Sequence, residues 1–363
     1  MATATVVGLG NIGSAITTLV ARMPGITGII LVDPDSYDES NLATQMIDRS
    51  ALGKPKVEVQ AASVLAINPR IQVETFDEPV ENVPLESLRS SVFISCVDSR
   101  RARQSINRIA WRCASPWIDA AVDAPSLIRI NAYRPGEKAP CLECSWDQAS
   151  YDLLEQDYPC DAADLSAPAT MAPAELGLLA ASLQAAELRK LINPAPNQGN
   201  SLVGAQLMLD TSTHEQYLAQ FKYTRDCRFD HLCWEVETVN FDLRSSRLAD
   251  LFDAAQTQAD PVINLEGHVF ATHLDCIACG KRSTPGLSLY HRLPARARRC
   301  PCGGQMFAPG FFSFETLQRS DLSPANLDLK LTALGFRYGD VITVDSASSR
   351  SRHLGIGAGQ ADE

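Results

Sequence analysis

The chain has 363 residues and is 45% hydrophobic, which is ample for a sizeable core. Its 32 basic and 43 acidic side chains give a net charge of −11, which excludes a chain-wide positive field for nucleic acid or an anionic membrane. No apolar run approaches the roughly 20 residues of a membrane span, and the N-terminus lacks the order of a signal peptide, so we expect a cytoplasmic protein with small-molecule or protein partners.

The first half of the chain alternates apolar runs with segments of helical spacing. Residues 3–8 form a β-rich run, the glycines follow at once, and residues 14–23 continue with apolar residues at helical spacing. A second buried strand, 28–35, ends in acids, and a helix is expected near Lys56. Further strands are expected at 71–76, 91–98 and 117–122. This alternation predicts an α/β fold with a Rossmann-like, mostly parallel sheet and helices on both faces.

The composition of the chain changes after residue 134. After residue 134 it becomes loop-like and acidic until about residue 173, and an Ala- and Leu-rich helix, AELGLLAASLQAAELRKLI, then ends before Pro194. From about residue 246 a polar helix leads into a separate cysteine-bearing module. We therefore expect a main domain over 1–245, a C-terminal module over 246–346, and a flexible tail over 347–363 because that segment is small and polar.

The glycines after the first strand match the pattern G-x-G-x-x-G. Gly8 permits the tight turn, Gly10 lets the backbone approach a phosphate, and Gly13 lets the helix pack on the strand. The helix N-terminus then faces the anion. Asp33 closes the second strand about 20 residues later, where a carboxylate can bind a ribose hydroxyl. Taken alone, this pattern indicates an NAD-dependent oxidoreductase, or a glycine turn of purely structural use.

The polar segment after the second strand favours a different nucleotide. It carries acids, amides and a lysine, which a dehydrogenase does not need but a triphosphate with its magnesium ion does. Over residues 3–192 the ordered patterns G-x-G-x-x-G, D-x-D, S-N-L-x-R-Q, G-x-x-K and a later aspartate resemble the ubiquitin-activating-enzyme-like superfamily, the ThiF/MoeB adenylyltransferases. The resemblance implies a site for ATP and Mg²⁺.

The resemblance also implies a role for each matched position. Asp33 corresponds to the ribose ligand, and Asp98, at the end of VFISCVD, to the magnesium ligand. The phosphate-binding positions are Asn41, Gln45 and Lys56. Asp35 and Arg49 lie on the same loop and are further candidates.

Two departures from the family pattern concern arginines. The arginine of N-L-x-R-Q is Thr44 here, and we expect no helix ahead of the first strand to supply the arginine that many members bring from that side. Catalysis therefore needs Arg49, another residue or a partner to compensate. A non-catalytic subunit that binds a ubiquitin-like protein is the alternative that these departures favour.

Eight of the eleven cysteines fall in closely spaced sets, which in a reducing compartment indicates metal binding. Cys141 and Cys144 form a C-x-x-C knuckle where the family usually places half of a structural zinc site. The other half is expected from Cys227 with His231 or Cys233. The spacing leaves both alternatives open, and the resemblance favours His231.

The second cysteine set lies in the C-terminal module and has the spacing of a zinc ribbon. A C-x-x-C pair and a C-x-C pair are separated by a twenty-residue loop, and a glycine follows each pair, so that the chain can fold back. The four predicted zinc ligands are Cys276, Cys279, Cys300 and Cys302. The basic loop ARARR between the pairs is read as a solvated charge run.

Cys160 belongs to neither set. It lies in the acidic stretch, and the resemblance places it on the loop, about residues 150–173, that crosses over the active site. The following helix carries the family pattern Q-A-x-E as Gln184, Ala185 and Glu187. In relatives that form a thioester or persulfide this thiol is the nucleophile, and a thiolate attacks an acyl-adenylate readily.

The expected function is ATP-dependent adenylation of the C-terminal glycine of a ubiquitin-like or sulfur-carrier protein, followed by thioester transfer to Cys160. The zinc ribbon is a candidate docking module for the carrier or for a conjugating enzyme, and the family resemblance implies a homodimer. The alternatives are the oxidoreductase and the non-catalytic subunit.

Overall fold

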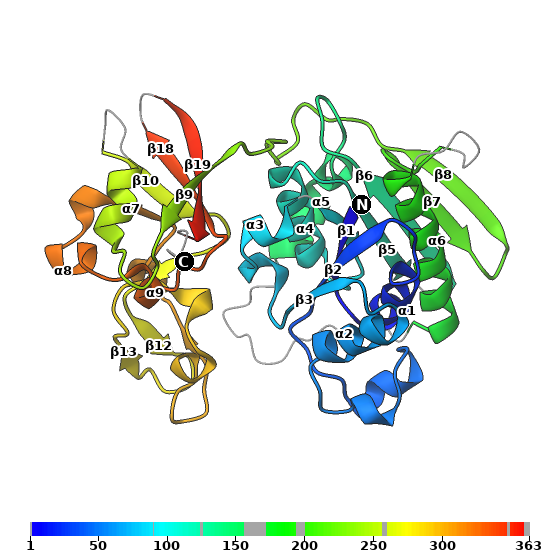
Figure 1. Ribbon diagram of the computed structural model, residues 1–363, viewed down its shortest axis with the longest axis horizontal. Helices are drawn as coiled ribbons and strands as arrows, with labels where there is room; N and C mark the ends of the chain where they lie inside the picture. The colour runs from blue at the N-terminus through cyan, green and yellow to red at the C-terminus, as the bar shows by residue number, and fades with distance from the viewer. Residues whose placement is uncertain are drawn as a thin grey trace. The chain divides into compact units, whose positions relative to one another are not determined.

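The computed structural model describes residues 2–89, 91–123, 126–155, 172–193, 200–255, 260–346 and 349–358. The chain divides into two compact units. The first comprises residues 1–83 and 88–233, and the second comprises 84–87 and 234–363. In Figure 1 the first unit, blue to green, is a sheet covered by helices, whereas the second, lime to red, is built mainly of short strands.

The first unit is organised by one sheet, which within the described residues has eight strands in the order β3-β2-β1-β4-β5-β6-β7-β8. Neighbouring strands from β3 to β5 pair in parallel, and those from β5 to β8 pair antiparallel. The predicted Rossmann-like, mostly parallel sheet is therefore confirmed. The strands are β1 (Ala2–Val7), β2 (Ile26–Val32), β3 (Gln72–Phe76), β4 (Ser91–Ser95), β5 (Trp117–Asp123), β6 (Leu127–Tyr133), β7 (Ala205–Asp210) and β8 (Glu215–Gln220).

Helices cover both faces of this sheet, as predicted. Helices α1 (Asn11–Val20) and α6 (Ala174–Ile192) lie side by side on one face, and α4 (Arg100–Arg112) lies on the other (Figure 1). Ile16, Leu31 and Leu188 belong to one buried apolar cluster between the first pair and the sheet. The remaining helices of this part are α2 (Lys56–Ile67) and α5 (Gln148–Glu155), whereas most of α3 (Leu85–Leu88) belongs to the second unit. None of the described helices has both the length and the apolar character that crossing a bilayer requires.

The carboxyl ends of β2, β1 and β4 meet at one edge of the sheet. The amide of Gly8 donates to Val32 O at 2.9 Å, and the amide of Cys96 donates to Val7 O at 2.8 Å. The chain leaves β1 for β2 on one side, whereas β4 lies on the other side of β1, so this edge is a topological switch point. Open α/β sheets bind ligands in the crevice at such a point.

The second unit contains a five-stranded sheet in the order β17-β10-β18-β19-β9 and two three-stranded sheets, β14-β11-β16 and β13-β12-β15, among the residues described. Its helices are α7 (Leu248–Ala254), α8 (Pro324–Leu327) and α9 (Leu331–Leu334). Its strands are β9 (Val236–Phe241), β10 (Val262–Leu265), β11 (Phe270–Ala271), β12 (Leu274–Cys276), β13 (Arg282–Ser283), β14 (Ser288–Leu289), β15 (Met306–Phe307), β16 (Ser313–Phe314), β17 (Thr316–Gln318), β18 (Val341–Ser346) and β19 (Ser349–Ala358). The small β13-β12-β15 sheet carries the first cysteine of the expected ribbon.

Two expected boundaries differ from the structure, and one strand pairing explains both. The tail expected to be flexible contains β19, which pairs with β18 on one side and in parallel with β9 on the other. Because β9 belongs to this sheet, the second unit begins at Trp234 and not at residue 246. The correction has a physical reason: a small, polar segment gains order when its backbone hydrogen bonds are satisfied by two neighbouring strands.

Candidate functional site

The glycine turn between β1 and α1 uses its three glycines in different ways. Gly8 has a positive φ of 84°, and a Cβ there would lie 2.7 Å from Cys96 O. A Cβ on Gly13 would lie 1.9 Å from Gly8 O, so α1 packs directly on the turn. At Gly10 the nearest atom to an added Cβ is Gln45 Nε2, 3.9 Å away. Other protein atoms therefore fill the space beside Gly8 and Gly13, whereas the space beside Gly10 is open. A phosphate can thus approach the backbone at Gly10.

Asp33, directly after β2, holds this turn. Its Oδ2 accepts from the amide of Leu9 at 2.6 Å, and its Oδ1 accepts from the amide of Asp35 at 2.8 Å. The residue is 5% exposed, and burial raises the pKa of this carboxyl even though Lys56 and the two amides act in the opposite direction. The structure thus assigns Asp33 a role in shaping the turn, and its contact with a ribose stays a prediction.

Lys56 begins α2 and lies against the acids of β2. Its Nζ is 2.9 Å from Asp35 Oδ2 and 3.8 Å from Asp33 Oδ1, and its side chain is only 9% exposed. The side chain of Asp35 is 66% exposed, so this carboxylate is open to a ligand while Asp33 is not. A buried ammonium beside an open glycine turn is suited to phosphate charge.

Tyr37 is a residue of this site that the sequence analysis missed. It is 1% exposed, its hydroxyl donates to Leu9 O at 2.8 Å, and the hydroxyl accepts from Gln60 Nε2 at 2.9 Å. Leu9 is thereby bound by its amide to Asp33 and by its carbonyl to Tyr37. No motif in the sequence signalled this, because the contact joins residues that are 28 positions apart in the chain.

The amides of the polar segment are placed differently from each other. Gln45 lies beside Gly10, and its Oε1 is buried without a hydrogen-bond partner among the described residues. Asn41 instead accepts from the amide of Asp38 at 3.0 Å, within a capping box of the short 3-10 helix Glu39–Ala43. An orphaned buried amide oxygen at the turn is consistent with a site that binds a polar ligand. Gln45 therefore lies beside the glycine turn, whereas the Asn41 side chain is used in a hydrogen bond within its own loop.

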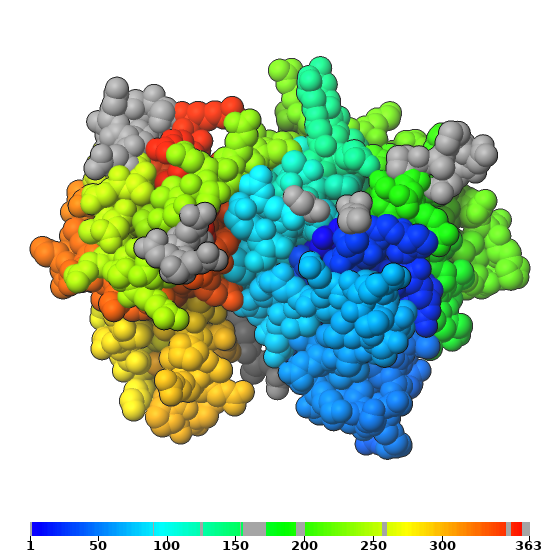
Figure 2. All heavy atoms as spheres, in the orientation of Figure 1, coloured from blue at the N-terminus to red at the C-terminus, as the bar shows by residue number. Residues whose placement is uncertain are grey.

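Arg49 lies at the surface of the same segment, which projects from the first unit as the blue lobe in Figure 2. Its side chain is 77% exposed and lies 3.4 Å from Glu39 Oε1. An ion pair so exposed contributes little energy and constrains the side chain weakly. The structure does not bring Arg49 into the group of Gly10, Lys56 and Gln45, and its catalytic role stays a prediction.

Asp98 follows β4 on the side of the glycine turn. Cys96 O packs against Gly8, Val97 Cγ1 lies 3.2 Å from the position of a Cβ there, and Asp98 comes next and is exposed. An exposed carboxylate on this edge has the hard oxygen donors that Mg²⁺ prefers. Together, Asp98 and Asp35 flank the turn from β4 and β2.

The helix that follows the acidic stretch is tied to the same edge. Asn11 Nδ2, at the start of α1, donates to Ala172 O at 2.7 Å, so the chain enters α6 beside the glycine turn. Gln184 is fully buried, with its Nε2 donating to Ser95 O at 2.9 Å and Ile118 O at 3.2 Å. Glu187 accepts from the amide of Leu202 at 2.8 Å. Gln184 therefore joins α6 to β4 and β5, and Glu187 joins α6 to the segment before β7. Cys160 lies outside the described residues.

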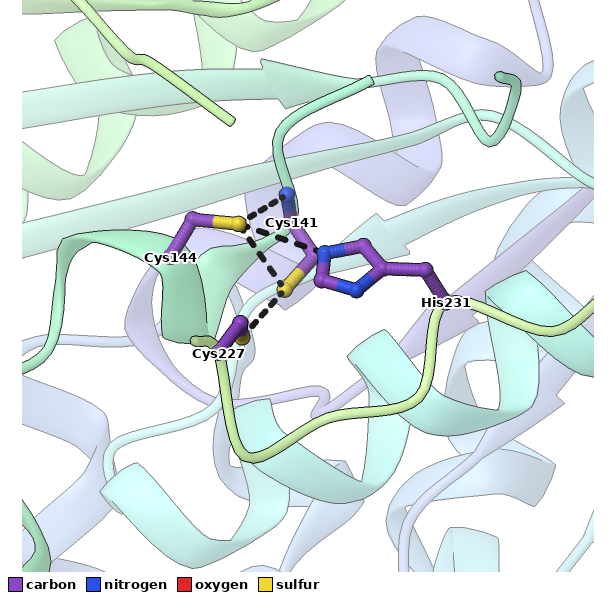
Figure 3. A group of neighbouring side chains, drawn as sticks. All are labelled: Cys141, Cys144, Cys227 and His231. Carbon is purple, nitrogen blue, oxygen red and sulfur yellow. Dashed lines mark hydrogen bonds between the residues drawn. The ribbon is translucent and has the colours of Figure 1, made fainter. Parts of the chain in front are cut away.

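The first cysteine set assembles with a histidine (Figure 3). Cys141, Cys144, Cys227 and His231 place their ligand atoms within 4.8 Å of one another. The Cys141 sulfur is 3.8 Å from that of Cys144 and 3.7 Å from that of Cys227, and the Cys144 sulfur is 3.2 Å from His231 Nε2. Tetrahedral zinc with Zn–S bonds of about 2.3 Å requires sulfurs about 3.8 Å apart, so this Cys₃His set fits zinc.

Helix α4 fixes the loop that brings His231 to this cluster. Arg112 is 6% exposed and donates to both carboxylate oxygens of Asp230, at 2.7 and 2.9 Å, and to Leu232 O at 2.9 Å. The Trp111 ring meets the His231 ring edge-on, with centroids 4.9 Å apart. These contacts orient the imidazole toward the sulfurs. Cys233, the alternative ligand, is exposed and is not in the group.

The second cysteine set also converges. The sulfurs of Cys276 and Cys302 are 3.5 Å apart, and those of Cys279 and Cys300 are 3.7 Å apart. All four sulfurs lie within 4.8 Å of one another. Gly280 and Gly303, after the two pairs, have φ values of 69° and 89°, the left-handed turn that the fold-back needs. Four thiolates in this arrangement fit a closed, structural zinc site.

Removing His231 is expected to release about half of the bound zinc, because two four-ligand clusters are present. His231→Ala should lower the zinc content and the melting temperature of the protein, measured by elemental analysis and calorimetry. Cys233→Ala is the matched control and should keep both values. Loss of zinc in the cysteine variant with retention in the histidine variant would contradict this ligand assignment.

Comparison with known proteins identifies relatives for the first unit. The ThiF family model matches residues 2–228. The molybdopterin-synthase adenylyltransferase of Salmonella typhimurium is 30% identical over 212 residues, which are 57% of this chain and 78% of that protein. The ubiquitin-like modifier-activating enzyme 5 of Drosophila willistoni is 28% identical over 158 residues, 39% of this chain and 38% of that protein.

Solved structures support the fold. The crystal structure of E. coli MccB with succinimide aligns with a TM-score of 0.51 at 22% identity, covering 64% of this chain and 66% of that one. The structure of E. coli MccB with ATP aligns with a TM-score of 0.50, covering 62% of this chain and 65% of that one. The chain therefore spans slightly less than two thirds of the MccB chains that it matches.

Proposed function

We propose, from the premise that this chain belongs to the ThiF family, that it uses ATP to adenylate the C-terminal glycine carboxylate of a ubiquitin-like or sulfur-carrier protein. The observation that carries the proposal is the group at the carboxyl edge of β2, β1 and β4. It combines a turn left open at Gly10, the orphaned amide oxygen of Gln45 and the buried ammonium of Lys56. Exposed carboxylates at Asp35 and Asp98 flank it.

The glycine turn, Lys56 and Asp98 each have a task in adenylation. A carboxylate oxygen of the carrier attacks the α-phosphorus of ATP, the bond from that phosphorus to the bridging oxygen breaks, and pyrophosphate leaves. The amides at the start of α1 and the ammonium of Lys56 hold the phosphate charge during this step. Asp98 would hold Mg²⁺, which would neutralise charge on the leaving pyrophosphate.

A second step follows from the thiol in the acidic stretch. The Cys160 thiolate attacks the carbonyl carbon of the acyl-adenylate, the bond to the phosphate oxygen breaks, and AMP leaves, which preserves a high-energy thioester. The acyl group then passes to a conjugating enzyme or another acceptor. A second copy of the chain, as a homodimer, is the proposed source of the phosphate-binding arginine that Thr44 does not provide.

The names of two relatives support the first step, since one is a molybdopterin-synthase adenylyltransferase and the other a ubiquitin-like modifier-activating enzyme. The oxidoreductase alternative is not favoured, because an NAD site would leave Gln45 and Lys56 without a task. The alternative of a non-catalytic subunit is still supported by Thr44, which replaces the arginine of the family pattern. Turnover of ATP by the isolated chain would exclude this alternative.

The proposal predicts ATP–pyrophosphate exchange by the purified chain in the presence of Mg²⁺ and a matching carrier protein. We expect Asp98→Asn to lower the exchange rate at least about 100-fold, because an amide holds the cation far more weakly than a carboxylate. Glu39→Gln, on the exposed Arg49 pair, is the control and should exchange like the wild type. Absence of exchange with carriers encoded beside the gene would overturn the proposal.

The thiol step is tested separately in the same assay. Cys160→Ala should keep exchange and lose the carrier adduct that a thiol reagent releases, as seen by intact mass. An undiminished adduct in this variant would assign the thioester to another cysteine. Cys233→Ala, an exposed cysteine outside the metal cluster, is the matched control.

A further inference from the structure

The loop between β4 and α4 is held on both sides of Asp98. On one side the amide of Cys96 donates to Val7 O at 2.8 Å, and Cys96 O packs against Gly8. On the other side Ser99 caps α4, with its Oγ accepting from the amide of Ala102 at 3.1 Å. Hydrogen bonds thus hold the backbone both before and after Asp98. One side chain of α4 also binds the backbone directly before Asp98.

That side chain is Arg103, one turn into α4. Its Nη2 donates to Val97 O at 2.7 Å, the carbonyl directly before Asp98. Its Nε donates to Asp119 Oδ1 at 3.1 Å, on the neighbouring strand β5. The Arg103 side chain is 14% exposed and that of Asp119 is 3% exposed. Ser95 Oγ also donates to this carboxylate, at 2.6 Å, so both ends of the clamp are fixed.

We propose that Arg103 is the positioning residue for Asp98: its fork binds Val97 O and Asp119 at once and so presents the Asp98 carboxylate to the divalent cation. The inference rests on the proposed function, because that function supplies the cation. Groups that orient a metal ligand affect metal binding strongly, typically 10- to 100-fold on mutation. Arg103 does not touch the substrate, so its effect acts through Asp98.

Charge alone cannot account for this arrangement. Burial acts to lower the pKa of Arg103, but Asp119, Asp123 and Asp98 outweigh it and raise the pKa, so the guanidinium stays charged. A positive charge beside Asp98 opposes the binding of a second cation. An electrostatic role would therefore weaken Mg²⁺ binding, whereas a positioning role strengthens it, and the two make opposite predictions.

The test is the Mg²⁺ concentration that gives half-maximal pyrophosphate exchange. Arg103→Lys keeps the charge but loses the fork, and we expect this concentration to rise about tenfold with a smaller change in kcat at saturating Mg²⁺. Arg103→Met should raise it at least as much. Arg101→Met is the matched control, because Arg101 donates from the same helix to another main-chain carbonyl, Leu154 O, at 2.9 Å.

A binding measurement separates this inference from the proposed function. Mn²⁺ binding with a non-hydrolysable ATP analogue, followed by electron paramagnetic resonance, should weaken about tenfold in both Arg103 variants and not in Arg101→Met. Exchange in the wild type with unchanged metal dependence in the Arg103 variants overturns the inference and leaves the function standing. Tighter metal binding by Arg103→Met, or Mn²⁺ binding that Asp98→Asn leaves unaltered, also overturns it. Thermal melting identifies a variant that fails to fold. If Arg103→Met does not fold, the metal dependence of Arg103→Lys, which can still pair with Asp119, tests the inference.

Discussion

Replacing Gly13 by alanine is expected to lower the free energy of unfolding by about 2–3 kcal/mol and to abolish ATP binding. The added Cβ would lie 1.9 Å from Gly8 O, so the first turn of α1 has to move away from the nucleotide turn. The gain in helix propensity, about 1 kcal/mol, does not offset this overpacking. Urea unfolding and the thermal shift produced by ATP with Mg²⁺ measure the two effects.

Gly10→Ala is the matched control for this prediction. Its Cβ would meet only the side-chain atom Gln45 Nε2, at 3.9 Å, and no backbone atom. The free energy of unfolding should therefore fall by less than in Gly13→Ala, by about 1 kcal/mol or less, because the added methyl group overpacks nothing. ATP binding should nevertheless weaken about tenfold or more, because the methyl group occupies the approach to the backbone. A Gly10→Ala protein that binds ATP normally would show that phosphate does not approach there.

Lys56→Met is expected to reduce pyrophosphate exchange by about 100- to 1000-fold, as for loss of a preorganised charge at a reacting phosphate. It should also destabilise the fold by roughly 3 kcal/mol at neutral pH, because Asp33 would be left buried without its cation. Lys54→Met, on the same segment but exposed, is the control and should change neither value appreciably. Exchange kinetics and urea unfolding provide the measurements.

The stability loss in Lys56→Met should depend on pH with a definite sign. The folded-state pKa of Asp33 already lies above its usual value because of burial, and Lys56 opposes that shift. Without the lysine this pKa rises further, so the variant loses stability relative to the wild type as pH rises through it. The difference should shrink toward acid pH, as Asp33 becomes protonated, and be largest at neutral pH and above, where Asp33 is charged. A deficit that grows toward acid pH would contradict the proposed pairing.

The sequence predicted the geometry of the glycine turn where residues close in the chain make the contacts, while the roles of these residues in binding stay predictions. Gly8 and Gly13 touch each other within one turn, and Asp33 closes the adjacent strand, so a local pattern is sufficient. The same holds for the helix Ala174–Ile192, which matches its predicted bounds. The pattern was less informative for Asn41, because its amide is used by a cap within its own loop.

The sequence could not predict contacts that depend on distant packing. Tyr37 meets Leu9, 28 residues earlier in the chain, and Gln60 of α2 also binds its hydroxyl. Arg103 meets Asp119 because β5 lies beside β4. His231 is selected over Cys233 by Arg112 and Trp111, which lie more than a hundred residues earlier. Spacing along the chain carries no information about such partners.

The sequence by itself determined the glycine turn, the first five strands in chain order, and the cysteine pairs that are close in the chain. Only the tertiary structure decided which ligand completes the first metal cluster, how Asp98 is held and where the second unit begins. The physical reason is that local motifs depend on backbone geometry and short spacing, which the sequence displays directly. Long-range pairs, such as β19 with β9, depend on sheet order and packing, which form only when the whole chain folds.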